Sequence, residues 1–323
     1  MTIGGGTGSF PILRALKNQP VNLTAIVSMA DDGGMAGVLR DEYGVLPPSD
    51  VRKTLVALAE PGSILRELFN YRFSEGSFKG CAFGNFFLAA LEKITGSFAE
   101  AVKEASKVLK VKGSVIPVTL SDARLCAKLA DGAVIKGETN IDIPTKDFRP
   151  AIKKVWLEPK AEINPQAETA IKTADLIVIC PGDLYTSIIP NFLVKGMKEA
   201  VKKSKAKKVC FVNLMTKFGE THGFKAEDFI KTIEKYLGRD ALDFVVFNSK
   251  KPRAEILKRY KKEKAEFVEP PGKSKKTKPV YIRADLLASG GFIRHDPGEK
   301  TSKILLAILN ELDNPNKNQK ASF

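Results

Sequence analysis

Short apolar runs alternate with longer amphipathic segments along most of the chain. The runs are bounded by polar or glycine residues, which is typical of buried parallel strands, and they occupy residues 23–29, 175–180, 208–212, 244–247 and 280–282. Helices are expected between and around them, at residues 54–59, 86–94, 98–109, 168–174, 192–203 and 300–312. This alternation predicts an α/β protein with a Rossmann-like, mostly parallel, doubly wound sheet.

A second pattern interrupts the alternation near the middle of the chain. Three short apolar strands follow one another, punctuated by prolines and an Asp131-Gly132 turn, at residues 115–119, 133–137 and 154–157. We therefore predict a small β-rich insertion at 113–160. It would interrupt a nucleotide-binding core made of residues 1–112 and 161–312, and a flexible tail would follow at 313–323.

A glycine-rich loop near the N-terminus directly precedes a helix-like run at residues 10–17. Glycine lets a ligand approach bare backbone, and a helix N-terminus favours an anion. The candidate phosphate-binding residues are Gly4, Gly5, Gly6, Thr7, Gly8 and Ser9. The alternative is a glycine-rich turn without a ligand.

Polar residues also follow the later strands. The run at 23–29 leads to Asp31 and Asp32, which could hold ribose hydroxyls or a divalent metal, although an Asx turn explains them as well. The run at 175–180 leads to a polar loop at 181–187. Because ligands bind at the carboxyl ends of parallel strands, we expect these loops to line one cleft.

Two further places carry unusual charge. Ser49 or Asp50 is a natural N-cap, but Arg52 and Lys53 follow it in a first turn where the helix dipole disfavours cations. This mismatch indicates an anionic ligand or an acidic neighbour. Near the C-terminus, Arg294 is a candidate phosphate partner. His295 could act in catalysis, and the alternative is a hydrogen-bonded turn histidine.

Composition narrows the class of protein. No apolar run approaches the roughly 18–20 residues that cross a bilayer, and the N-terminus lacks a signal-peptide pattern. The four cysteines form no CxxC pair, which fits buried free thiols in a cytoplasmic protein.

The net charge of +15 lies mostly in residues 151–323, which hold 34 Lys and Arg against 21 Asp and Glu. One interpretation is nucleic-acid binding, and the other is a set of solvated helix faces. The basic runs lack aromatic residues that could stack on bases, apart from Tyr260, which disfavours nucleic-acid binding.

Seven motifs follow one another along the chain: IGGGTGS (3–9), DDGG (31–34), LPPSDVR (46–52), GN (84–85), PGDLYTS (181–187), NLMT with GET (213–221) and RHDP (294–297). In this order they resemble the YvcK-like gluconeogenesis factors, a group related to the 2-phospho-L-lactate transferase CofD. The resemblance covers about residues 3 to 310. It implies a Rossmann-like fold that binds a nucleotide sugar, UDP-N-acetylglucosamine. It also implies a role in cell shape and carbon-source adaptation, without an established reaction.

The resemblance also implies which residues line the cleft. Besides the glycine loop, these are Asp31, Asp32, Asp50, Asn85, Pro181, Gly182, Asp183, Tyr185, Thr186, Ser187, Asn213, Thr216, Tyr260 and Arg294. Tyr260 would stack on the uracil or simply pack within its helix. The sequence departs from the family pattern at Met35-Ala36, where two serines are usual, and at Cys81-Ala82, where a histidine and a serine are usual.

The sequence also allows functions other than a nucleotide-sugar sensor. A Mg²⁺-dependent transferase could move a phospholactyl-type group from a nucleotide carrier to an acceptor alcohol, with Asp31 and Asp32 on the metal. An NAD(P)-dependent oxidoreductase is disfavoured because Ser9 stands where GxGxxG needs its third glycine. The absence of a dedicated nucleophile among the cleft residues favours a non-enzymatic role. The sequence leaves homo-oligomerisation open.

Overall fold

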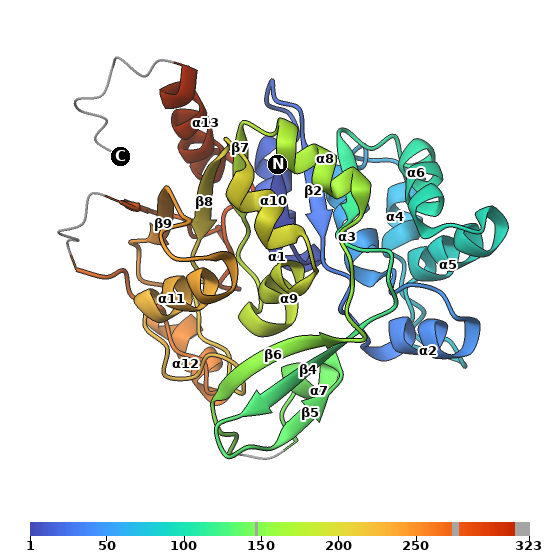
Figure 1. Cartoon of the computed structure of the whole chain (residues 1–323), viewed down its shortest axis with the longest axis horizontal. Helices are drawn as coiled ribbons and strands as arrows, with labels where there is room; N and C mark the ends of the chain where they lie inside the picture. Colours follow the sequence, from blue (N-terminus) through green and yellow to red (C-terminus); the bar gives the residue numbers. More distant parts are fainter. Residues whose placement is uncertain (146–147, 273–277, 314–323) are drawn as a thin grey trace.

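Seven parallel strands form the central sheet of the computed structural model, which describes residues 1–145, 148–272 and 278–313 (Figure 1). In sheet order they are β10 (Val280–Ala284), β9 (Phe244–Asn248), β8 (Lys207–Phe211), β7 (Leu176–Ile179), β1 (Thr2–Gly4), β2 (Thr24–Val27) and β3 (Ser114–Pro117). The chain starts at β1 in the middle, runs outward to β3, and continues at β7 on the other side of β1. This is the predicted doubly wound, Rossmann-like order.

Helices cover both faces of the sheet. α1 (Gly6–Leu16) contacts both α3 (Ser49–Leu58) and α13 (Glu299–Asp313) in one layer. α8 (Pro165–Thr173), α10 (Met197–Lys203) and α11 (Ala226–Leu237) lie in front of the sheet in Figure 1. The other helices are α2 (Gly34–Tyr43), α4 (Ile64–Asn70), α5 (Phe83–Thr95), α6 (Phe98–Val108), α7 (Glu138–Asp142), α9 (Ile189–Leu193) and α12 (Ala254–Lys262), with a π-helical turn at Leu184–Ile188.

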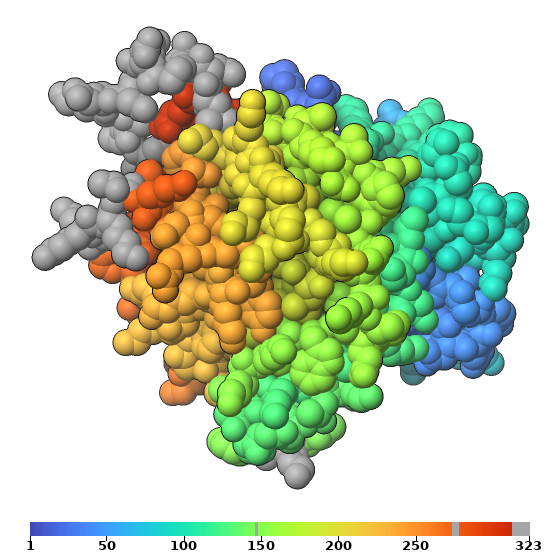
Figure 2. Space-filling model, in the orientation of Figure 1, coloured from blue at the N-terminus to red at the C-terminus, as the bar shows by residue number. Residues whose placement is uncertain are grey.

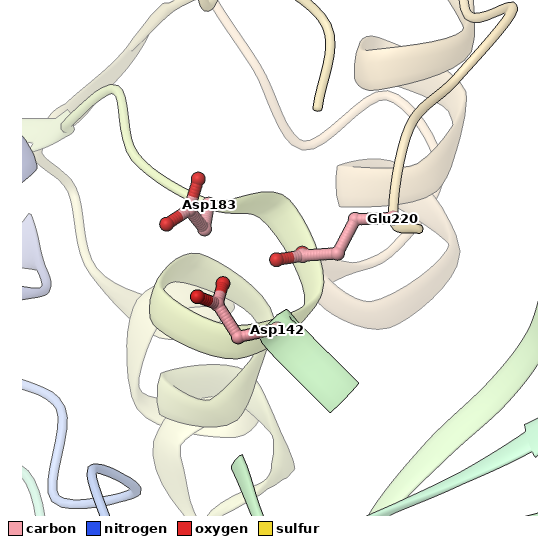
Figure 3. Close-up of side chains that lie close together, drawn as sticks. All are labelled: Asp142, Asp183 and Glu220. Carbon is pink, nitrogen blue, oxygen red and sulfur yellow. The ribbon is translucent and has the colours of Figure 1, made fainter. Parts of the chain in front are cut away.

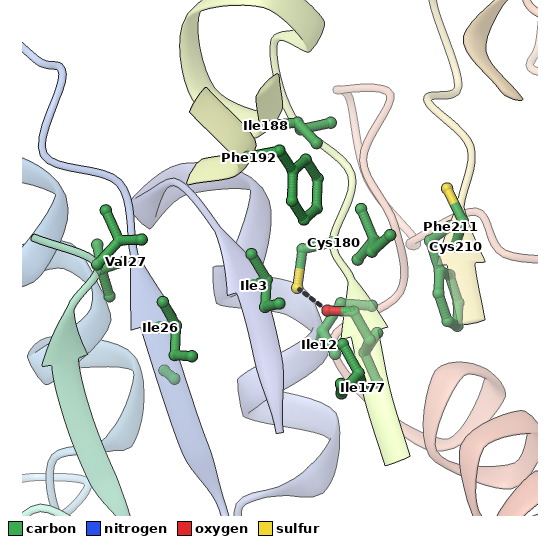
Figure 4. Packing of buried hydrophobic residues seen from close by; sticks show 14 of the residues in the cluster. Ile3, Ile12, Ile26, Val27, Ile177, Cys180, Ile188, Phe192, Cys210 and Phe211 are labelled. Atoms are coloured by element: carbon green, nitrogen blue, oxygen red, sulfur yellow. Dashed lines mark hydrogen bonds between the residues drawn. The ribbon is translucent and has the colours of Figure 1, made fainter. Parts of the chain in front are cut away.

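The inner strands are apolar on both sides because helices cover both faces. Ile3 of β1 and Ile177 of β7 have no exposed surface, and Cys180 packs beside them at the end of β7 (Figure 4). All four cysteines are free and buried, as predicted. Burial raises the pKa of the Cys180 thiol to about 12, so this group is inert as a nucleophile.

The β-rich insertion forms a separate antiparallel sheet that projects below the core in Figure 2. It contains β4 (Arg124–Leu129), β5 (Val134–Lys136) and β6 (Ile152–Glu158), in the order β5-β4-β6. The assignment of a strand at 115–119 to this insertion was wrong. β3 instead pairs with β2 in the main sheet, because a short apolar strand carries no signal that identifies its partner.

Local backbone geometry explains other differences from the predicted elements. The helix expected at 192–203 is divided into α9 and α10 by Gly196, whose φ of +96° is left-handed. The glycine-rich segment after Asp32 starts a helix, α2, that the sequence did not indicate. None of the described helices is both long and apolar enough to cross a membrane. The tail predicted as flexible lies almost wholly outside the described residues.

Candidate functional site

The loops that follow β1 and β7 meet where the strand order reverses, the position at which open α/β sheets bind ligands. A β-carbon built on Gly8 would lie only 1.8 Å from the carbonyl oxygen of Pro181. One built on Gly6 would lie 2.6 Å from the backbone oxygen of Asp50. Two of the loop glycines are therefore required by backbone packing within the protein, whereas the sequence interpretation explained them by a ligand.

A pocket of about 390 Å³ opens beside this contact. Its walls come from the carboxyl ends of β1, β7 and β8, from Tyr260 of α12, and from the segment before α13. Its lining residues are Thr7, Gly8, Phe10, Pro11, Lys53, Pro181, Gly182, Asn213, Leu214, Met215, Tyr260, Ile293, Arg294 and His295. A largely apolar wall with a few convergent polar groups is typical of small-molecule sites.

Asn213 holds two of the strand-end loops in register. Its Nδ2 donates to the Gly182 carbonyl oxygen at 2.6 Å, and its Oδ1 accepts from the Gly182 amide at 3.3 Å. Both polar atoms of the amide are thus engaged by backbone. Asn213 lines the pocket, as expected, and it also fixes the shape of the pocket floor.

Tyr260 and Arg294 flank the pocket from the C-terminal part of the chain. The Tyr260 hydroxyl accepts a hydrogen bond from the Ile293 amide at 3.0 Å, which sets the direction of the ring. The exposed guanidinium of Arg294 lies 5.6 Å from the centre of the Phe292 ring. The pocket therefore has an aromatic ring and an exposed cation on the same side.

His295 lies on the buried side of the pocket. Burial lowers the pKa of its imidazole to about 4, against a hydrogen bond to the backbone of Val212 that raises it. The ring is therefore neutral at pH 7 and is a weak base. This arrangement agrees with the hydrogen-bonded turn histidine that the sequence offered as the alternative to a catalytic role.

The two cations in the first turn of α3 have different partners. Lys53 faces the pocket and its ammonium lies 3.3 Å from Asp50, the acidic neighbour that the sequence suggested. Arg52 is buried and donates from Nε to Asn85 Oδ1 at 3.0 Å and from a terminal nitrogen to the Phe69 carbonyl oxygen at 3.2 Å. Arg52 and Asn85 therefore join helices inside the protein.

Asp31 and Asp32, the paired acids after β2, also lie in different environments. Asp32 accepts hydrogen bonds from the backbone amides of Glu138 and Thr139, each at 2.9 Å, and so fastens α7 of the insertion to the core. Burial and the neighbouring Asp50 raise the pKa of Asp31. Burial and the surrounding carboxylates raise the pKa of Glu138 to about 9, so this carboxyl group is protonated at pH 7.

A group of three carboxylates lies deeper, between the insertion and the loops after β7 and β8. Asp142, Asp183 and Glu220 point toward one another, with ligand atoms within 4.8 Å (Figure 3). The ammonium of Lys217 pairs with Asp142 and lies 2.9 Å from Asp183 and 3.9 Å from Glu220. Burial opposes this charge, but the carboxylates raise the pKa of Lys217 above its usual value.

These contacts indicate whether the acidic residues could bind the metal ion that a transferase would need. A divalent ion among the three carboxylates would have to displace Lys217, so the group fits its ammonium better than Mg²⁺. Both oxygens of Asp32 already accept backbone hydrogen bonds. Asp31 and Asp32, the ligands suggested by the sequence, are not part of the three-carboxylate group.

Several expected site residues face the protein interior. Ser9, Tyr185, Thr186 and Thr216 are buried. The Thr186 hydroxyl donates to Glu220 at 2.9 Å, and Thr216 accepts from the Glu266 amide at 2.8 Å. Sequence reasoning missed the apolar lining Phe10, Pro11, Leu214, Met215 and Ile293, because such residues look like ordinary core. It also missed Glu138, Asp142 and Lys217, although the strand-end position of Lys217 was a usable signal.

The fold and pocket define an α/β protein of the Rossmann type with a small-molecule site at its topological switch point. The family model for 2-phospho-L-lactate transferase CofD matches residues 1–287, and the chain belongs to this family. Within it, the chain belongs to the gluconeogenesis factors, as the motifs indicated.

Relatives and solved structures support this assignment over most of the chain. The gluconeogenesis factor of Bacillus subtilis is 41% identical over 313 residues, which cover 95% of this chain and 97% of that protein. A Thermotoga maritima protein, provisionally named a gluconeogenesis factor, is 48% identical over 270 residues, covering 83% of this chain and 84% of that one. The crystal structure of a Bacillus halodurans protein of the UPF0052 family matches with a TM-score of 0.88 and 40% identity, over 95% of this chain and 99% of that one.

Proposed function

We propose that this protein binds a nucleotide sugar of the UDP-N-acetylglucosamine type and acts as a cytoplasmic regulator linked to cell shape and carbon-source adaptation. The observation that carries the proposal is the content of one pocket. The N-terminus of α1 at Thr7 and Gly8 faces it together with Lys53 and Arg294, and the ring of Tyr260 lies at its wall. Amides and cations suit a diphosphate, and an aromatic ring suits a base.

The chemistry of the neighbouring groups favours binding over catalysis. His295 is a weak base because burial lowers its pKa to about 4. Lys217 is held by three carboxylates and does not line the pocket. The cysteines are buried. Within the described part of the chain, the pocket lining contains no activated nucleophile with an adjacent base.

Isothermal titration with UDP-N-acetylglucosamine, UDP and GDP, each in Mg²⁺ and in EDTA, tests this proposal. We expect UDP-N-acetylglucosamine to bind in EDTA, and Arg294→Ala to weaken it at least about tenfold, or about 1.4 kcal/mol. The matched control is Arg239→Ala, an exposed arginine after α11 that does not line the pocket. Unchanged affinity in Arg294→Ala would contradict the proposed site.

A Mg²⁺-dependent transferase of the CofD kind is the second candidate. It is favoured by the family assignment and by the raised pKa of both Asp31 and Glu138, since a bound cation would relieve this crowding of carboxyl groups. For this function we expect GDP to bind only with Mg²⁺, and Asp31→Asn to abolish that dependence. Nucleotide-sugar binding that is equally tight with and without Mg²⁺ would exclude the transferase.

A further inference from the structure

A second concave site lies at the edge of the main sheet where the strands begin. Because the seven strands are parallel, this edge is opposite to the one that carries the pocket described above. A cavity of about 260 Å³ opens there between the segments that follow α10 and α11 and the first residues of β8. Its position separates it from the proposed nucleotide-sugar site.

The lining of this cavity is strongly basic. Its cations, which we call the basic cluster, are Lys202, Lys205, Lys207, Lys208, Arg239 and Lys278. Among the described residues, the only carboxylates that line the cavity are Asp240 and Asp243. Six cations against two carboxylates leave an excess of four positive charges in one small cavity.

Asp243 is already shared by several of these cations. Its carboxylate lies 3.1 Å from the ammonium of Lys278 and 3.8 Å from that of Lys207. It also accepts the Lys208 backbone amide at 2.9 Å. The ammonium of Lys208 instead donates to the Ser204 carbonyl oxygen at 2.6 Å. Asp243 therefore fixes the lysines at the starts of β8 and β10 but has no further capacity to neutralise charge.

The remaining cations of the basic cluster lack a counter-charge. Within the described part of the chain, no carboxylate lies within salt-bridge distance of Lys202, Lys205 or Arg239. Gly238 leaves room for one of them, since a β-carbon there would lie only 3.3 Å from the Lys202 side chain. An anion that enters the cavity would meet three free cations and would relieve the repulsion among them.

The lining also limits the kind of anion. Within the described residues, none of the side chains that line the cavity is aromatic, and its apolar members are Val201, Ala206 and Ala241. Surfaces for single-stranded nucleic acid stack bases on aromatic rings, and protein interfaces bury large apolar side chains. Arginine and lysine side chains suit phosphate oxygens. The cavity therefore fits a compact anion that consists largely of phosphate groups.

We propose that the basic cluster is a second ligand site, which binds a small molecule with two or more phosphate groups. A phosphate monoester carries about 1.5 to 2 negative charges at pH 7, so two of them match the excess of four positive charges in the lining. Arg239 binds one phosphate through its planar fork, and Lys202 and Lys205 bind the next. The two ligand sites lie at opposite edges of the sheet, so both can be occupied at once.

Isothermal titration with inorganic tripolyphosphate, in 50 mM NaCl and EDTA, tests the proposal. We expect a dissociation constant below about 100 µM, and an affinity at least about tenfold weaker in 0.5 M NaCl because salt screens these charges. The double variant Lys205→Ala/Arg239→Ala should weaken binding at least about tenfold. The matched control, Lys79→Ala/Lys93→Ala, removes two exposed cations outside the basic cluster and should bind as the wild type does.

A further variant should change the affinity in the opposite direction. Asp240 has a φ of +56°, a conformation that asparagine also adopts, so Asp240→Asn preserves the backbone. The substitution removes a negative charge from the lining and should tighten tripolyphosphate binding about two- to fivefold. A basic cluster with a purely structural role would show no such gain. Thermal unfolding confirms that these variants fold, since Lys205, Arg239 and Asp240 are exposed.

Three results would overturn the proposal. The first is no binding of tripolyphosphate at about 1 mM, and the second is equal weakening in the matched control. The third is tighter binding of a single-stranded RNA of about ten nucleotides that is lost in Lys205→Ala/Arg239→Ala, which would assign the basic cluster to nucleic acid.

The two proposed ligand sites fail independently of each other. Arg294→Ala should weaken nucleotide-sugar binding and leave the affinity for tripolyphosphate unchanged, whereas Arg239→Ala should have the reverse effects. Loss of tripolyphosphate binding in Arg294→Ala would place the anion in the other pocket and contradict the second site. A wild-type protein that binds tripolyphosphate but no nucleotide sugar would contradict the proposed function alone.

Discussion

Glu138 shows how burial and neighbouring carboxylates change the titration of a single side chain. Its pKa is raised from 4.5 to about 9 by burial and by neighbouring carboxylates. The folded protein therefore holds a proton that the unfolded chain releases above pH 4.5. The stability that this proton contributes is fully present below pH 4.5 and is lost as the pH rises through 9.

We therefore expect Glu138→Gln to be more stable than the wild type at pH 8, by about 2–4 kcal/mol, and nearly equal to it at pH 4.5. Urea unfolding at a series of pH values measures this difference. Glu104→Gln is the control: this acid on α6 is partly exposed and, among the described residues, pairs only with the exposed Lys107, so the change should alter stability by less than about 0.5 kcal/mol. A Glu138→Gln variant that is less stable at pH 8 would show that this carboxyl group is ionised in the folded protein.

At the residue scale, the sequence located the unusual residues but did not show why they occupy those positions. The glycine loop was located, but Gly8 is a glycine because Pro181 leaves no room for a β-carbon. The cation at position 52 was recognised as unusual, yet its partners are the neutral acceptors Asn85 and Phe69. Partners that lie 17 to 33 residues away along the chain leave no local pattern, so only the folded structure shows them.

At the scale of elements, Asp32 is the main polar link between β2 and the insertion. It accepts the amides of Glu138 and Thr139, which are the unsatisfied donors at the start of α7. Gly137 allows this approach, since a β-carbon there would lie 2.9 Å from Asp32 Oδ2. A side chain from the core thus caps a helix of the insertion.

Asp32→Ala should expose these two amides and destabilise the protein by about 1–2 kcal/mol. Asp32→Asn should lose less, because its single oxygen still accepts one amide. Hydrogen exchange resolves the effect, with faster exchange expected at residues 138–139 and little change in β8. Unchanged protection in Asp32→Ala would mean that other contacts hold the insertion.

The order of the strands along the chain was easier to predict than the sheet to which each strand belongs. β7, β9 and the last three residues of β8 are buried, and a buried parallel strand leaves a strong apolar pattern. β3 is as short as β7, but Ser114 is exposed and Ile116 only partly buried, so its sequence resembles the short strands of the insertion. The register with β2 that assigns it to the main sheet is a long-range property.

At the scale of the whole molecule, the two ends of the sheet differ in charge. Residues 34–96 hold seven Lys and Arg and seven Asp and Glu, whereas the basic cluster gathers where β8 and β10 begin. Its cations are Lys202, Lys205, Lys207, Lys208, Arg239 and Lys278, against Asp240 and Asp243. Burial lowers the pKa of Lys208, Asp243 opposes this shift, and the nearby cations Lys278 and Lys207 lower the pKa further. The cations of the basic cluster therefore repel one another in the folded protein.

This repulsion predicts the response to salt. Lys205 is exposed within the basic cluster, so Lys205→Glu should raise the free energy of unfolding in 20 mM NaCl by a few tenths to about 1 kcal/mol. The gain should shrink in 0.5 M NaCl, where the Debye length falls to about 4 Å. Lys93→Glu, at the last turn of α5 in the charge-balanced end, should instead lose stability, because a cation there complements the helix dipole. Urea unfolding of both variants at the two salt concentrations separates these signs. Stabilisation by both variants would show that repulsion is spread over the whole surface, whereas opposite signs place it at the basic end.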